Sequence, residues 1–182
     1  MNEESFEVRV SRKLLLVLTL VGLLFLLAGV EIGFTNTLIG PEVGQDKPVI
    51  KWIFVGFSTA LGGLITINCF LYLIAPPIML RITRENISFG TGFRYNLFDI
   101  PAKMLEKINT FTQESSVEVN GKKAIVEGGV ELYFKNVEEI PSQKTTSMGI
   151  QYHAYRLIIS STYADKPGNE IVDQTKKILG LK

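Results

Sequence analysis

WIFVGFSTALGGLITINCFLYLIA, residues Trp52–Ala75, is the stretch that decides the fold, and Pro76-Pro77 follows it directly. These 24 residues contain no Asp, Glu, Lys, Arg or His. A helix of this length is about 36 Å long, which is enough to cross a hydrocarbon core of about 30 Å with some tilt. The two prolines end the helix because proline lacks the amide hydrogen and restricts the residue before it. We therefore predict a membrane-spanning helix over residues 52–75.

A second apolar run lies upstream. Leu14–Val30 has 17 residues without a charge, and 13 of them are Leu, Val or Phe, so the run is apolar enough to insert into a bilayer. A basic segment before an apolar run also describes a signal peptide, but this run is long and Leu27–Val30 offers a poor cleavage site. We expect an uncleaved span over about residues 14–33, after a polar cytoplasmic leader at residues 1–13.

The orientation of this helical hairpin follows from its flanking charges. Residues 34–51 are rich in turn formers and form the expected outer loop, with basic residues only at Lys47 and Lys51. The other side of the membrane has more basic residues, and these are Arg9, Arg12, Lys13, Arg81 and Arg84. Because basic residues favour the cytoplasmic side, we expect a multi-pass protein of the cell (inner) membrane with both termini in the cytoplasm.

Small residues recur along both spans, and those expected to pack helices together are Gly29, Gly33, Gly56, Ala60 and Gly63. Such stripes let helix backbones approach closely. One interpretation is a face that joins copies of the chain into a homo-oligomer. The other is packing of the two helices on each other, which the general abundance of glycine in membrane helices favours.

After the prolines the hydrophobic period changes from helical to alternating, which predicts a small cytoplasmic domain over residues 76–182. Asn120-Gly121 is the strongest hairpin signal because it supplies the positive φ angles of a type I′ turn. Lys103–Gln113 fits a short turn of helix followed by a strand. A further turn is expected at Gly128-Gly129, and His153–Ser160 alternates as one strand. The polar residues Asn136–Gln151 are expected to form a long loop.

The end of the chain is predicted to be helical, over about residues 169–180. Ile171, Thr175 and Ile178 share one face with their neighbours, and acidic residues come before lysines, as the helix dipole favours. Gly180 is a suitable C-cap. The domain is therefore expected to hold about seven short strands and one closing helix.

This order of strands and one terminal helix resembles a pleckstrin-homology-like (PH-like) domain, and more closely the small two-pass bacterial membrane proteins that carry such a domain. The residues that carry the resemblance are Leu80–Ile87, the strand start at Asp99-Ile100-Pro101 and the helix around Glu170–Leu179. It implies an α+β fold: an N-terminal two-helix transmembrane hairpin, then a PH-like antiparallel β-barrel or sandwich closed by a C-terminal α-helix. Many such bacterial proteins have no assigned biochemical role.

PH domains of eukaryotes bind lipid headgroups through basic residues on their first strands. The corresponding residues here are Arg81, Arg84 and Arg94, which are candidate contacts to lipid or to the membrane surface. Each cation near an anionic bilayer contributes about 1 kcal/mol. The alternative is that Arg81 and Arg84 only determine topology and that Arg94 is a solvated strand residue. The domain's net charge of only +2 from Ile78 onward favours this alternative.

No pattern of catalytic residues, metal ligands or cofactor-binding loops stands out. His153 is the one histidine and Cys69 the one cysteine, and a net charge of +1 gives no reason to expect nucleic acid. We therefore expect a non-enzymatic, membrane-anchored interaction module without metal or cofactor, which binds a protein or lipid partner through Asn136–Gln151 or a sheet edge. The alternative function is a subunit of an oligomeric membrane transporter or channel complex.

Overall fold

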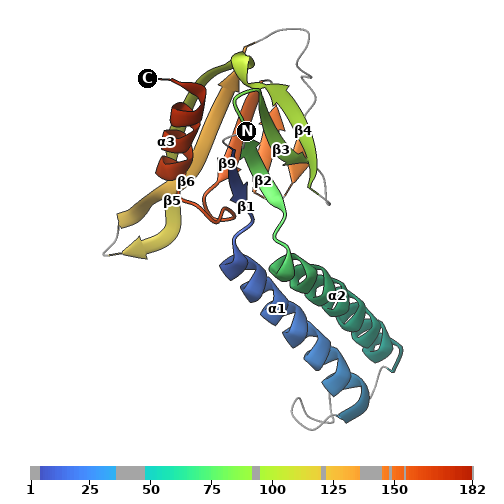
Figure 1. The fold of residues 1–182 in the computed structure, drawn as a ribbon. Helices are drawn as coiled ribbons and strands as arrows, with labels where there is room; N and C mark the ends of the chain where they lie inside the picture. Colours follow the sequence, from blue (N-terminus) through green and yellow to red (C-terminus); the bar gives the residue numbers. More distant parts are fainter. Residues whose placement is uncertain are drawn as a thin grey trace. The chain divides into compact units, whose positions relative to one another are not determined.

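A computed structural model describes residues 5–35, 48–91, 95–119, 122–135, 145–147, 149–153 and 155–181. The fold is of the mixed α+β class, with two long apolar helices, two antiparallel sheets and a C-terminal helix (Figure 1). The chain divides into two compact units. One is the helical hairpin, Arg12–Pro76, and the other combines the residues up to Ser11 with those from Pro77 onward.

The hairpin consists of α1 (Arg12–Val30), which continues into a π-helical turn (Glu31–Thr35), and α2 (Pro48–Ile74). Both helices are long and apolar enough to span a membrane. Each begins earlier than expected, and Pro48 suits the first turn of α2 because that turn needs no amide hydrogen. The first and last residues of the expected outer loop 34–51 are therefore helical, whereas residues 36–47 lie outside the described part of the chain.

The first sheet combines one strand that precedes the helical hairpin in the sequence with three strands that follow it. Its order is β1-β2-β3-β4, and all neighbours are antiparallel. The strands are β1 (Phe6–Arg9), β2 (Ile78–Ile82), β3 (Asn86–Thr91) and β4 (Asn96–Pro101). Residues 6–9, within the expected polar leader 1–13, instead form an edge strand that pairs with β2.

Alternation explains why this charged segment forms a strand. Phe6 and Val8 are buried, whereas Glu7 and Arg9 between them are partly exposed. Val10 continues the pattern, being 1% exposed and bridged to Ala164. Burial of each such side chain contributes about 1.5–3 kcal/mol, which is enough to order a short strand against an existing sheet.

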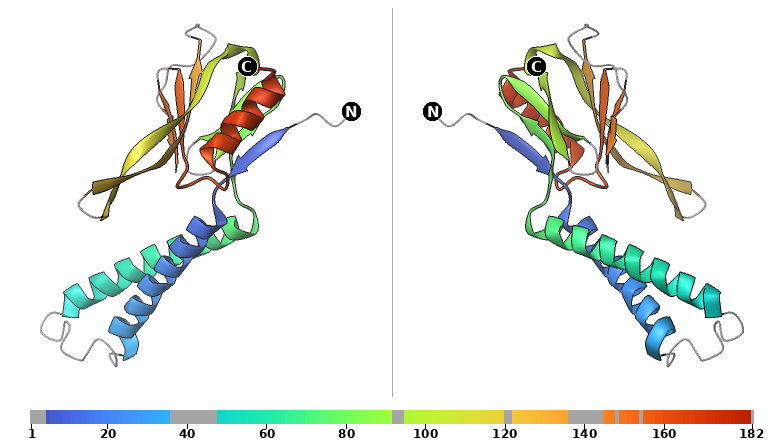
Figure 2. Two further views of the ribbon diagram at one scale, coloured as in Figure 1. Left: turned by 90° about the vertical axis from the view of Figure 1, so that its left-hand side faces the viewer. Right: turned by 90° about the vertical axis from the view of Figure 1, so that its right-hand side faces the viewer.

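The second sheet has the order β5-β6-β9-β8-β7 and is also antiparallel. Its strands are β5 (Leu105–Val119), β6 (Lys122–Phe134), β7 (Thr145–Ser147), β8 (Ile150–His153) and β9 (Arg156–Ser160). The long β5–β6 hairpin projects beyond the other strands (Figure 2). A 3-10 turn, Ala102–Met104, precedes β5, which confirms the expected helical turn followed by a strand.

Three local expectations in this sheet differ from the structure. Gly128-Gly129 is not a turn but an irregularity within β6, where Phe111 pairs with Gly129 and Thr112 with Glu127. His153–Ser160 is not one strand, because β8 and β9 form a tight hairpin in which His153 pairs with Arg156 and Tyr155 has a φ of +64°. β7 and the start of β8 lie within the expected loop Asn136–Gln151, of which residues 136–144 and 148 are outside the described chain. The described residues thus form nine strands.

The Asn120-Gly121 dipeptide also lies outside the described residues, but its flanks behave as predicted. Val119, just before it, pairs with Lys122, just after it.

The two sheets meet through a cluster of aromatic side chains. The Tyr152 ring lies 5.2 Å from that of Phe89 and 6.4 Å from that of Phe134, measured between centroids. The described strands form two separate sheets and not one closed barrel. Helix α3 (Gly168–Leu179), which confirms the helix predicted over residues 169–180, packs on β1, β5 and β6 and buries Ile171 and Ile178.

Candidate functional site

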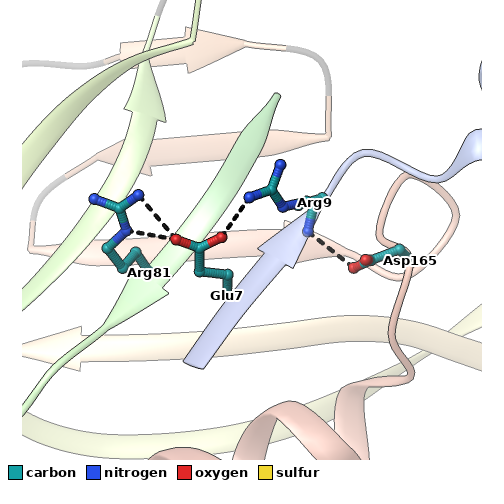
Figure 3. Close-up of polar contacts among 4 residues, drawn as sticks. All are labelled: Glu7, Arg9, Arg81 and Asp165. Atoms are coloured by element: carbon teal, nitrogen blue, oxygen red, sulfur yellow. Dashed lines mark hydrogen bonds and ion pairs between the residues drawn. The ribbon is translucent and has the colours of Figure 1, made fainter. Parts of the chain in front are cut away.

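Arg81, the first predicted lipid contact, is held within the first sheet by an acidic residue (Figure 3). Its Nε and Nη2 atoms lie 2.9 and 2.8 Å from Oε1 of Glu7 on the neighbouring strand. Arg9 binds the other carboxylate oxygen, with 2.6 Å between its Nη2 and Glu7 Oε2. The backbone N–H of Arg9 also donates to Asp165 Oδ1 at 2.8 Å. One carboxylate therefore links two arginines across β1 and β2.

The electrostatics of this cluster favour a structural role for Glu7, Arg9 and Arg81. Burial tends to raise the pKa of Glu7, but hydrogen bonds and charge from Arg9 and Arg81 outweigh it and hold that pKa below its ordinary value. The two arginine side chains remain 43% and 38% exposed, so their outer edges still face solvent. The cluster ties the strand that precedes the hairpin to the strand that follows it.

The other two predicted arginines are placed differently. Arg84 is exposed and lies in the turn between β2 and β3, beyond the Glu7 cluster. Arg94 lies outside the described residues. The structure therefore brings Arg81 together with Arg9, a residue that the lipid-contact prediction did not include, and shows no described cluster of the three predicted arginines.

The predicted helix-packing residues lie on different faces of the hairpin. A β-carbon on Gly29 would lie 2.6 Å from Thr59 Oγ1, and one on Gly33 would lie 3.2 Å from Val55 Cγ1, so both glycines face the partner helix. Gly63 lies at the margin of this contact, where a β-carbon would be 3.9 Å from Leu26 Cδ2. Gly56 has no atom within 4 Å of such a carbon, and Ala60 is exposed.

Two further glycines also approach the partner helix closely. A β-carbon on Gly22 would lie 2.6 Å from Thr66 Oγ1, and one on Gly62 would lie 2.7 Å from the backbone nitrogen of Leu26. The predicted set, Gly29, Gly33, Gly56, Ala60 and Gly63, does not include either of them, because its small residues were chosen at four-residue spacing. The seven-residue interval from Gly22 to Gly29, which returns to the same helix face after two turns, is the signal that identifies this seam.

The outer face of the five-stranded sheet contains a cavity. It has a volume of about 650 Å³, and its lining includes Phe111, Gln113, Glu131, Gln151, Arg156 and Tyr163. Of the residues that line the cavity, only Ser147, Gly149 and Gln151 fall within the predicted contact segment Asn136–Gln151. The lining residues come mostly from β5, β6, β8 and β9 and, for Tyr163, from the turn after β9. Only the sheet order brings these segments together, and no local motif marks them.

Glu131 organises the charged part of this cavity. It accepts hydrogen bonds from Tyr133 Oη at 2.6 Å and from Arg156 Nη2, and the Arg156 guanidinium also lies over the Tyr133 ring. Burial raises the pKa of Glu131, but the bonds from Tyr133 and Arg156 more than offset this and keep that pKa below its ordinary value. The same bond to Glu131 raises the pKa of Tyr133. The carboxylate and guanidinium thus form a neutral pair at neutral pH.

His153 is exposed on β8, outside the residues that line this cavity. Among the described residues, no group of three or more His, Cys, Asp or Glu side chains gathers closely enough to hold a metal ion. Comparison with protein-family models, with curated proteins and with solved structures gives no match.

Proposed function

We propose that this chain is a non-enzymatic, membrane-anchored interaction module. Helices α1 and α2 cross the inner membrane, and the PH-like domain lies at its cytoplasmic surface. There the outer face of the five-stranded sheet is presented to a protein or lipid partner. A four-stranded antiparallel sheet, a second antiparallel sheet and a C-terminal helix support the PH-like interpretation.

The pairing of β1 with β2 carries this proposal. β1 precedes the hairpin and β2 follows it, and two strands can pair only on one side of a bilayer. The hairpin would therefore enter and leave the membrane on the same side. The excess of arginine and lysine in the flanking residues supports the cytoplasm as that side.

The surface of the helices supports a lipid environment. Only 28% of the apolar window of α1 and 17% of that of α2 is buried, unlike the core helices of soluble proteins. Leu24, Leu27 and Ile67 are each more than 60% exposed. A soluble protein rarely exposes so continuous an apolar surface. Thr19 and Asn68 also fit a bilayer, because each donates its side-chain hydrogen bond to a carbonyl four residues earlier in its own helix.

Labelling of single cysteines tests the topology. In a Cys69→Ser background, we expect Ser5→Cys and Asn96→Cys to be protected from a membrane-impermeant maleimide in intact cells. Gln45→Cys, between the helices, is expected to react. All three should react after detergent is added, which controls for intrinsic reactivity. Equal labelling of Gln45→Cys and Asn96→Cys in intact cells would contradict the proposed arrangement.

Site-specific photo-crosslinking tests the interaction role. A photoreactive amino acid at Gln151, on the outer face, is expected to capture a reproducible partner in membranes, whereas one at Asp173, exposed on α3, is not. If Gln151 yields no adduct with protein or lipid, or if both positions yield the same adducts, the outer face is not the binding surface.

A further inference from the structure

Two aromatic rings in the cavity of the outer sheet face pack tightly on glycines. A β-carbon on Gly128 would lie 2.4 Å from Cε2 of Phe111, and one on Gly149 would lie 2.4 Å from Cβ of Tyr163. Gly149 also has a φ of +77°, a backbone angle that residues other than glycine rarely adopt. Any larger residue at either position would displace the ring beside it. Both rings are therefore held against the backbone of the cavity wall.

The polar lining consists largely of groups that both donate and accept hydrogen bonds. Gln113 and Gln151 contribute exposed side-chain amides, and Ser147 and Ser160 contribute hydroxyls. The Ser147 hydroxyl donates to the Gly90 carbonyl at 3.1 Å, so its remaining capacity is as an acceptor. Strands β6, β9 and β8 are paired on both sides in the ladder, and recognition along them therefore depends on side chains.

The charges in the cavity oppose selection of an ion. Arg156 is bound by Glu131, and Glu131 has only 12% of its side chain exposed. An anion would have to compete with this carboxylate for the guanidinium, and a cation would meet Arg156 beside the carboxylate. A neutral ligand can instead hydrogen-bond to the outward edge of the pair without separating it.

We propose that this cavity binds a small, uncharged, soluble saccharide. Sugar hydroxyls each donate and accept, which matches the two amides, the Ser160 hydroxyl and the acceptor capacity left on Ser147. The C–H face of a sugar ring packs on aromatic rings such as Tyr163 and Phe111. Ile158 adds an apolar contact to the lining. The volume of about 650 Å³ lies within the range of about 300–1,000 Å³ that is typical of small-ligand sites.

This inference rests on the proposed function in one respect, which is that the outer sheet face is open in the anchored protein. The saccharide proposal and the proposed function can be contradicted independently of each other. Saccharide binding is measured on purified protein with both sides accessible, so it does not depend on topology or on a captured partner. Conversely, a negative binding result leaves the cysteine-labelling pattern unchanged.

Saturation-transfer NMR on the full chain in phosphatidylcholine nanodiscs tests the proposal, because sugar-based detergents would occupy the site. The probes are maltose, cellobiose and N-acetylglucosamine, with glucose 6-phosphate and a dialanine peptide as charged and peptide comparisons. We expect transfer to at least one neutral sugar and weaker transfer to the comparisons. Transfer to none of the sugars, or stronger transfer to the phosphate or the peptide, would overturn it.

Matched variants locate the binding. Gln151→Ala and Gln113→Ala each remove one exposed amide and are expected to weaken binding up to about tenfold. His153→Ala is the control, since it removes an exposed side chain from the same strand as Gln151 but outside the cavity lining. Unchanged affinity in both glutamine variants, or equal weakening in His153→Ala, would contradict a saccharide site in this cavity.

Discussion

Val8 pairs with Leu80 in the register of β1 and β2, and neither side chain has any exposed surface. The two residues lie on opposite sides of the helical hairpin in the sequence. Their contact makes the strand domain discontinuous, since it can be completed only when residues before and after the hairpin come together. The salt bridge between Glu7 and Arg81 and the contact of Lys166 Nζ with the Phe6 ring, 4.1 Å from its centroid, reinforce the same edge.

Val8→Ala is expected to lower the free energy of unfolding of the strand domain by about 2 kcal/mol, because it leaves a cavity beside β2. Ser5→Ala, at an exposed position just before β1, is the control and should change it by less than about 0.5 kcal/mol. Urea unfolding of the full chain in micelles measures the change in each variant. Hydrogen exchange of the β2 amides then compares the local stability of the sheet in the two variants. Equal exchange rates in the two variants would show that β1 does not stabilise the sheet.

Gly22→Ala is expected to separate α1 from α2 and to destabilise the hairpin by about 1–3 kcal/mol, because the new methyl would lie 2.6 Å from Thr66 Oγ1 and 2.9 Å from its backbone nitrogen. Gly56→Ala makes the same chemical change where no atom lies within 4 Å, and it should be neutral or slightly stabilising. Unfolding by increasing sodium dodecyl sulfate in mixed micelles compares them. The same loss in both variants would place the helix contact elsewhere.

The Glu131–Arg156 pair predicts a stability change in acid. Because the pKa of Glu131 is lowered in the folded protein, its contribution is fully present above the ordinary pKa of 4.5 and is lost as the pH falls through the lower folded value. Glu131→Gln should cost about 1 kcal/mol at pH 7, with the difference from the wild type vanishing in acid. Urea unfolding from pH 7 to pH 3 measures this. Glu106→Gln, an exposed acid on the same sheet, is the control and should not show the same convergence.

Tyr152 predicts a change at the alkaline end. Burial is the main cause that raises its pKa from 10 to about 12, with a smaller contribution from the charge of Tyr155. Stability from the neutral phenol is fully present below pH 10 and is lost as the pH rises through about 12. Phenolate absorbance should therefore show a component that titrates near pH 12 and disappears in Tyr152→Phe. The raised pKa of Tyr133 should be unchanged in that variant. The variant should also lose less stability than the wild type between pH 10 and pH 12. A component near pH 12 that persists in the variant would assign it to another tyrosine.

Much of the secondary structure follows from local sequence. The uncharged run that contains Trp52–Ala75 predicts α2, and the spacing of Ile171, Thr175 and Ile178 predicts α3. The turn before β5 and the hairpin around Asn120-Gly121 can also be predicted from the sequence, because each depends on a few consecutive residues. These features require only hydrophobic periodicity or the backbone preferences of particular residues.

The residues of the candidate site cannot be predicted from local sequence. Phe111, Glu131, Gln151 and Tyr163 lie far apart in the sequence, and their types are common on any exposed strand face. Only the order β5-β6-β9-β8-β7 places them around one cavity. The sequence predicts one strand over His153–Ser160, because apolar and polar residues alternate on both sides of the tight β8–β9 turn. The structure has a hairpin there instead.

By itself, the sequence determined that two apolar helices form a hairpin, that strands follow it and that a helix ends the chain, because these depend on contacts between near neighbours. Tertiary structure alone decided that Phe6–Arg9 belongs to the first sheet, since four residues with two buried side chains become a strand only when β2 supplies hydrogen bonds and a core. It also decided which glycines form the helix seam. Gly22 and Gly56 are chemically identical, and only the position of the partner helix makes one essential and leaves the other free of contact.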